Sequence, residues 1–70
     1  MEPRKQFAIN LRAERKRLKL TQEALGFKCD LNVSEVSRLE RCKRDPRLAT
    51  IVKLAGALQI PPAKLLDGIP

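Results

Sequence analysis

Apolar residues recur along this chain at intervals of three and four positions, which is the spacing of one face of an α-helix. The clearest series are Phe7, Leu11 and Leu18 and, further on, Leu48, Ile51, Leu54, Ala55 and Leu58. No Asn-Gly or Asp-Gly pair joins two strand-like segments as a tight β-hairpin turn would, and strand-like alternation is nearly absent. The pattern therefore predicts an all-α fold, a compact bundle of four to five short helices joined by tight turns.

Residues suited to helix ends mark where these helices begin. The first helix is expected to begin near Arg4. Thr21 is placed to cap the second helix with its hydroxyl group, and Asn32 can cap the third with its side-chain amide. A basic loop over residues 42–47 precedes the fourth helix, and the prolines that follow this helix turn the chain into a short fifth.

Residues 22–41 are predicted to form a helix, a sharp turn and a second helix. Helices joined by so short a turn cross at a steep angle, and Gly26 is the small residue expected where the third helix approaches the second. Val36 and Leu39 point back into this angle, so the polar side of the third helix faces outward. A DNA major groove about 12 Å wide could admit that helix. We therefore predict a helix-turn-helix here, with residues 33–41 as the helix that enters the groove.

The length of the chain limits its organisation. Residues 1–70 are expected to form a single domain, near the lower size limit for a core that folds without disulfides or metal. No apolar run approaches the ~20 residues that a membrane-spanning helix needs. The first residues also lack the apolar segment of a signal peptide. These features predict a soluble, cytoplasmic protein.

The charge of the chain narrows the class of partner. Fifteen basic residues against eight acidic ones give a net charge of +7 and a pI near 10.1, which favours a polyanion. An anionic membrane would require a helix with an exposed apolar face, whereas the first and fourth helices use theirs in the core. The two phenylalanines, Phe7 and Phe27, are the only aromatic residues and are expected to pack inside. Without a platform for stacking unpaired bases, the predicted partner is double-stranded DNA and not a single strand.

The chain lacks the residues of a catalytic or metal site. It has no histidine, no glycine-rich phosphate loop and no pair of carboxylates that stands out from ordinary helix surface. Cys29 and Cys42 cannot supply the four ligands of a zinc site, and the helical segment between them should keep them apart as reduced thiols. We predict no enzymatic activity, no metal and no cofactor. A chain of this length also leaves no room for a domain that binds a small-molecule effector.

The chain carries a series of motifs in a fixed order. They are LTQEAL at 20–25, NVSEVSRLER at 32–41, KRDP at 43–46, LAGALQI at 54–60 and LL at 65–66. Together they resemble the phage repressor/Cro-type helix-turn-helix family, without gaps from about Phe7 to Leu66. The resemblance implies a lambda repressor-like DNA-binding domain. The chain departs from the family at two turns, where Asp30 and Cys42 replace the usual glycine; Asp tolerates a positive φ better than Cys.

The resemblance also implies roles for individual residues. Four side chains on the outer face of the third helix match positions that face base edges: Val33, Ser34, Ser37 and Arg38. Seven residues are expected at the phosphate backbone, although capping is the main role of the first: Thr21, Gln22, Asn32, Arg41, Lys43, Arg44 and Arg12. Arg15 and Glu40 match two positions that the family commonly joins in an ion pair, which would tie the first helix to the end of the third.

The chemistry of the four base-facing residues suits them to different contacts. Arg38 can donate two hydrogen bonds to the O6 and N7 acceptors of guanine. Ser34 can hydrogen-bond several bases, and Val33 offers an apolar contact to the methyl group of thymine.

The favoured function is that of a sequence-specific transcriptional regulator acting as a homodimer. A two-fold dimer would place two recognition helices ~34 Å apart on a near-palindromic operator. The residues expected at the dimer interface follow the fourth helix: Ile60, Pro61, Leu65, Leu66 and Ile69. The alternative is an antitoxin-like protein-interaction module for which DNA binding serves autoregulation. Phage repressors, restriction–modification controller proteins and antitoxins all remain open as the biological setting.

Overall fold

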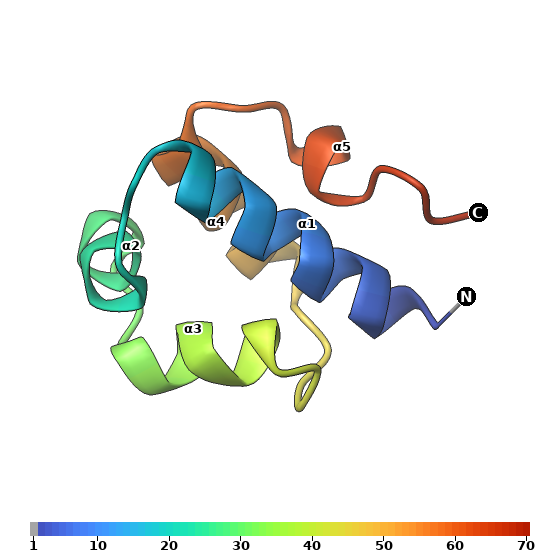
Figure 1. Cartoon of the computed structure of the whole chain (residues 1–70), viewed down its shortest axis with the longest axis horizontal. Helices are drawn as coiled ribbons and strands as arrows, with labels where there is room; N and C mark the ends of the chain where they lie inside the picture. Colours follow the sequence, from blue (N-terminus) through green and yellow to red (C-terminus); the bar gives the residue numbers. More distant parts are fainter. Residues whose placement is uncertain (1) are drawn as a thin grey trace.

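This computed structural model describes residues 2–70 of the chain, which contain five helices (Figure 1). They are α1 (Pro3–Arg17), α2 (Gln22–Cys29), α3 (Val33–Glu40), α4 (Leu48–Leu58) and α5 (Pro62–Leu65). In Figure 1, α3 and α5 lie on opposite sides of α1, and α2 lies beside the end of α1 that is far from the N-terminus. Residues 2–70 contain no strand, so the predicted all-α fold is confirmed.

The hydrophobic core draws on every helix. Its most deeply buried side chains are Leu11, Leu25, Val36, Leu54, Leu58 and Leu65. Phe7 is buried as predicted, but the prediction for Phe27 is wrong, because 90% of Phe27 is exposed. Phe27 lies two residues after Leu25, and positions two apart on a helix point to nearly opposite sides.

Both predicted helix caps are present. The Thr21 hydroxyl accepts a hydrogen bond from the backbone N–H of Ala24 at 3.0 Å and caps α2. Asn32 Oδ1 accepts one from the backbone N–H of Glu35 at 2.9 Å and caps α3. The third helix ends at Glu40, one residue earlier than predicted, and Arg41 forms its C-cap.

The turn between α2 and α3 depends on a left-handed residue and on a glycine. Asp30 adopts φ 60° and ψ 39°, and the backbone N–H of Leu31 donates to the carbonyl of Gly26 at 2.8 Å. A Cβ on Gly26 would lie only 2.6 Å from the Leu31 carbonyl oxygen. Gly26 therefore admits the turn that leads into α3, whereas the sequence predicted a close approach of α3 itself. Cys42, at the turn after α3, also adopts a positive φ, of 62°.

Side-chain amides on α1 hold the C-terminal segment in place. Asn10 Nδ2 donates to the carbonyl oxygens of Leu65 at 3.0 Å and Asp67 at 2.8 Å. Gln6 Nε2 donates in turn to Asn10 Oδ1 at 2.9 Å, which fixes the orientation of the Asn10 amide. The two contacts from Asn10 to the C-terminal segment join residues more than fifty positions apart, so the segment after α4 is anchored to the first helix.

Candidate nucleic-acid interface

The two faces of α3 differ sharply in burial. Val36 and Leu39 are buried against the core and fix the inner face of the helix. Ser34 and Arg38 are exposed on the other side, Val33 is exposed three positions before Val36, and Ser37 is half-buried. The structure thus brings all four onto one short helix, and the packing of the inner face sets the outward placement of Ser34 and Arg38.

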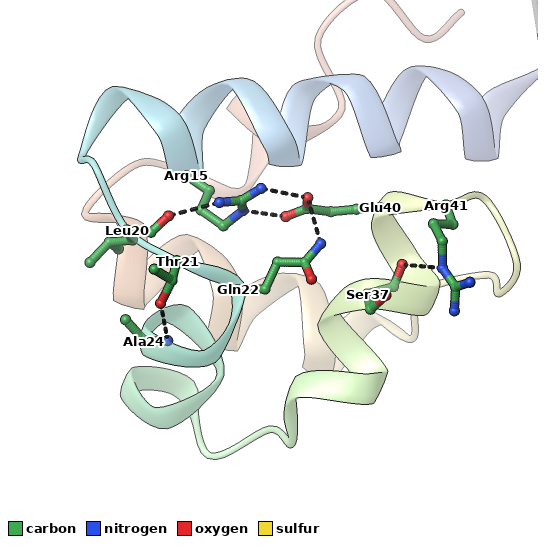
Figure 2. A network of polar contacts seen from close by, with 8 residues as sticks. All are labelled: Arg15, Leu20, Thr21, Gln22, Ala24, Ser37, Glu40 and Arg41. Atoms are coloured by element: carbon green, nitrogen blue, oxygen red, sulfur yellow. Dashed lines mark hydrogen bonds and ion pairs between the residues drawn. The ribbon is translucent and has the colours of Figure 1, made fainter.

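A buried ion pair fixes the C-terminal end of α3 to α1 (Figure 2). Arg15 Nε lies 2.6 Å from Glu40 Oε2, and its Nη2 donates to Glu40 Oε1 at 2.9 Å, as the resemblance implied. The two side chains are only 11% and 3% exposed. Hydrogen bonding to the Glu40 carboxylate raises the pKa of the Arg15 guanidinium. Arg15 Nη1 also donates to the Leu20 carbonyl at 2.7 Å, which ties in the turn before α2.

Gln22 is a third member of this network. Its Nε2 donates to Glu40 Oε1 at 3.2 Å, and the side chain is half-buried (Figure 2). The sequence reading placed Gln22 at a phosphate and missed this contact, because nothing local connects residues 18 positions apart. The second Nε2 proton remains free to donate to a phosphate oxygen, so the predicted role and the observed one are compatible.

Basic and polar side chains surround the outer face of α3. Arg41, Lys43 and Arg44 are exposed just after the helix, and Asn32 is exposed at its start. The backbone N–H of Lys43 donates to the Arg38 carbonyl at 2.9 Å, which folds the loop back onto the helix end. Of the other predicted phosphate contacts, Thr21 is exposed before α2 and Arg12 is exposed on α1.

A cleft of about 350 Å³ lies between α3 and the loop that leads into α4. Its lining includes the guanidinium-bearing residues Arg38, Arg44 and Arg47. Arg47 is also the N-cap of α4, and no side chain caps that helix end. The sequence analysis did not name Arg47 as a candidate phosphate contact. Its position in the basic loop, directly before a helix, could have indicated that role.

The residues predicted at a dimer interface differ in their availability. Pro61 and Leu66 are exposed, and Ile60 and Ile69 are half-buried against the core. Leu65 is completely buried and packs in the core. The assignment of Leu65 to the interface is therefore corrected, because a residue without exposed surface cannot touch a second copy of the chain.

The two cysteines lie in different surroundings. Cys29 is buried on α2, its thiol donates to the Leu25 carbonyl at 3.1 Å, and burial raises the pKa of the thiol. Cys42 is half-buried in the turn after α3, and neither cysteine forms a disulfide.

Within residues 2–70, no helix is both long and apolar enough to cross a membrane.

These features define a helix-turn-helix protein: α2 and α3 joined by a tight turn, α3 packed on one side and polar on the other. A family model described as helix-turn-helix matches residues 11–65. The chain belongs to this helix-turn-helix family of DNA-binding transcriptional regulators.

Individual relatives support the same assignment. The control protein C.BamHI of Bacillus amyloliquefaciens is 42% identical over 48 residues, which are 69% of this chain and 59% of that relative's length. The restriction-modification controller protein C.AhdI of Aeromonas hydrophila has a similar structure, with a TM-score of 0.87 and 40% identity over 89% of this chain and 94% of that chain. The P22 c2 repressor, solved in complex with a synthetic operator, gives a TM-score of 0.81 and 35% identity over 89% of this chain and 94% of that chain.

Proposed function

We propose that this protein is a transcriptional regulator that binds a specific double-stranded DNA sequence by placing the outer face of α3 in the major groove. The observation that carries the proposal is the fixed, outward presentation of Ser34 and Arg38. Val36 and Leu39 hold the inner face of the helix, and the Arg15–Glu40 pair holds its end. A helix held in this way can present the same donors and acceptors to each base pair that it meets.

The charges around α3 support this proposal. Arg41, Lys43, Arg44 and Arg47 follow the helix closely, where phosphate groups on either side of the groove would lie. Similarity to the P22 c2 repressor, which was solved with an operator, supports the same kind of partner. A regulator of this kind is expected to act in the cytoplasm, which is consistent with binding to DNA.

We also propose that the protein acts as a dimer on a near-palindromic site. One short helix reaches only a few base pairs, so a single copy would bind weakly. Pro61 and Leu66 are exposed near each other in sequence, and Ile60 and Ile69 are partly exposed beside them. The relatives described above are controllers and a repressor, so the antitoxin-like alternative is not favoured.

Selection of bound duplexes from a pool with a random central segment tests both parts of the proposal. We expect enrichment of one near-palindromic sequence whose half-sites lie about 34 Å apart. Enrichment of a single unpaired half-site would contradict the dimer and leave the base-specific contact intact. Recovery of a pool as random as the input would contradict the regulator itself.

The salt dependence of binding tests the predicted phosphate contacts. Lys43→Ala and Arg44→Ala should each weaken binding to all duplexes alike and lower the slope of log K against log salt by about one. Lys64→Ala removes the same charge from α5, which lies on the other side of α1 from α3 (Figure 1), and serves as the matched control. Equal slopes for Lys43→Ala, Arg44→Ala and Lys64→Ala would show that the loop does not contact phosphate.

A further inference from the structure

The cap of α3 does more than satisfy the backbone. Asn32 Oδ1 accepts two hydrogen bonds, one from the backbone N–H of Glu35 at 2.9 Å and one from the Ser34 hydroxyl at 2.9 Å. A backbone N–H can only donate, so the Asn32 atom that faces Glu35 is the oxygen and not the amide nitrogen. The same oxygen faces Ser34 Oγ, and the Ser34 hydroxyl is therefore the donor in that second bond.

This arrangement fixes whether the Ser34 hydroxyl can donate or accept a further hydrogen bond. A serine hydroxyl has one proton to donate and two lone pairs that accept. The single proton of Ser34 is engaged by Asn32, so the exposed oxygen can only accept a hydrogen bond from another molecule. Ser37 differs in this respect, since among residues 2–70 its hydroxyl makes no such bond.

The acceptor character of the Ser34 oxygen matters because the bases differ in the hydrogen-bonding groups that they display in the major groove. Adenine presents the N6 amino group and cytosine the N4 amino group, both of which donate. Guanine presents only the N7 and O6 acceptors, and thymine presents the O4 acceptor and a methyl group. On the strand that it faces, an oxygen that only accepts would pair with adenine or cytosine and meet a second acceptor at guanine or thymine.

We infer that Asn32 acts as a positioning residue that makes Ser34 select an amino-bearing base, adenine or cytosine, at the position it contacts. This inference rests on the proposed insertion of α3 into the major groove. Guanine or thymine at that position would require the Ser34 hydroxyl to leave Asn32. The net worth of one hydrogen bond corresponds to a preference of roughly 2- to 10-fold.

The test uses the full chain and duplexes based on its selected operator. Ser34→Ala identifies the base pair that Ser34 contacts, as the position whose preference changes. The four versions of that base pair are then titrated with the wild-type protein and with Asn32→Gly. Glycine at an N-cap costs a helix only a few tenths of a kcal/mol, so Asn32→Gly frees the Ser34 hydroxyl without melting α3.

The wild-type protein should bind the adenine or cytosine duplexes roughly 2- to 10-fold more tightly than the guanine or thymine ones. In Asn32→Gly this ratio should fall toward one, while preferences at the other positions of the site persist. Lys53→Ala, on the exposed surface of α4 and outside the proposed interface, is the control, and it should leave the ratio unchanged. Thermal unfolding of each variant confirms that it is folded.

Several outcomes would overturn the inference. They are a wild-type preference for guanine or thymine at the Ser34 position, an unchanged ratio in Asn32→Gly, and a Ser34→Ala variant with no altered position. Each of these leaves the proposed function standing, because the operator as a whole is still preferred. Only the absence of preference for any duplex would remove both.

Discussion

Replacing Glu40 by alanine is expected to lower the free energy of unfolding by about 3–5 kcal/mol. The substitution leaves the buried guanidinium of Arg15 without its partner, and a buried unpaired charge is among the most costly defects a fold can carry. It also removes the acceptor for Gln22 Nε2. Urea-induced unfolding followed by circular dichroism measures the effect.

The matched control for this variant is Glu14→Ala. Glu14 pairs with Arg17 at 2.8 Å, but Arg17 is half exposed, so the loss should stay below about 1 kcal/mol. A double variant, Arg15→Met with Glu40→Leu, should recover most of the stability, since it removes both charges together. If Glu40→Ala were no more damaging than Glu14→Ala, the account of how α3 is held would be wrong.

Replacing Arg38 by alanine is expected to weaken binding to the selected operator by about 1–3 kcal/mol and to relax the preference at one base pair. Arg38 is exposed on α3, so the stability of the fold should not change. The loss on random duplexes should be smaller, because only the charge contributes there. Fluorescence anisotropy with operator and scrambled duplexes gives both affinities.

Arg38→Lys separates the two contributions. Lysine keeps the charge but lacks the planar fork that donates two parallel hydrogen bonds to guanine. We expect Arg38→Lys to bind random DNA like the wild type and to discriminate poorly at the same base pair. Equal losses on operator and random DNA for Arg38→Ala would refute the assigned contact.

Much of the fold could be predicted from local features of the sequence. The three- and four-residue spacing of apolar positions identified the helices, and the caps at Thr21 and Asn32 are formed by side chains that act within three residues. The Arg15–Glu40 pair came from the family resemblance, because no local rule connects residues 25 positions apart. Local patterning and family likeness thus supplied different parts of the structure.

The errors have a common physical origin in tertiary contacts. On a helix of eight residues such as α2, composition does not reveal which face is covered, and Phe27 was assigned to the core although it points away from it. Leu65 was assigned to an interface although α1 and α4 cover it. The hydrogen bond from Gln22 to Glu40 likewise depends on how helices distant in sequence pack together, which local sequence patterns do not reveal.

The inferred role of the Ser34 hydroxyl as an acceptor follows only from the structure. The sequence showed a serine able to pair with several bases. The distances around Asn32 Oδ1 restrict it to an acceptor. A cap that is ordinary for the stability of α3 can therefore influence which base is preferred.

Methylation interference on the selected operator tests the central claim most directly. Dimethyl sulfate methylates guanine at N7, in the major groove, and adenine at N3, in the minor groove, so one experiment reports on both grooves. Insertion of α3 predicts that N7 methylation of a guanine within each half-site blocks binding, while N3 methylation there has little effect. Strong interference from adenine N3 together with none from guanine N7 would contradict it.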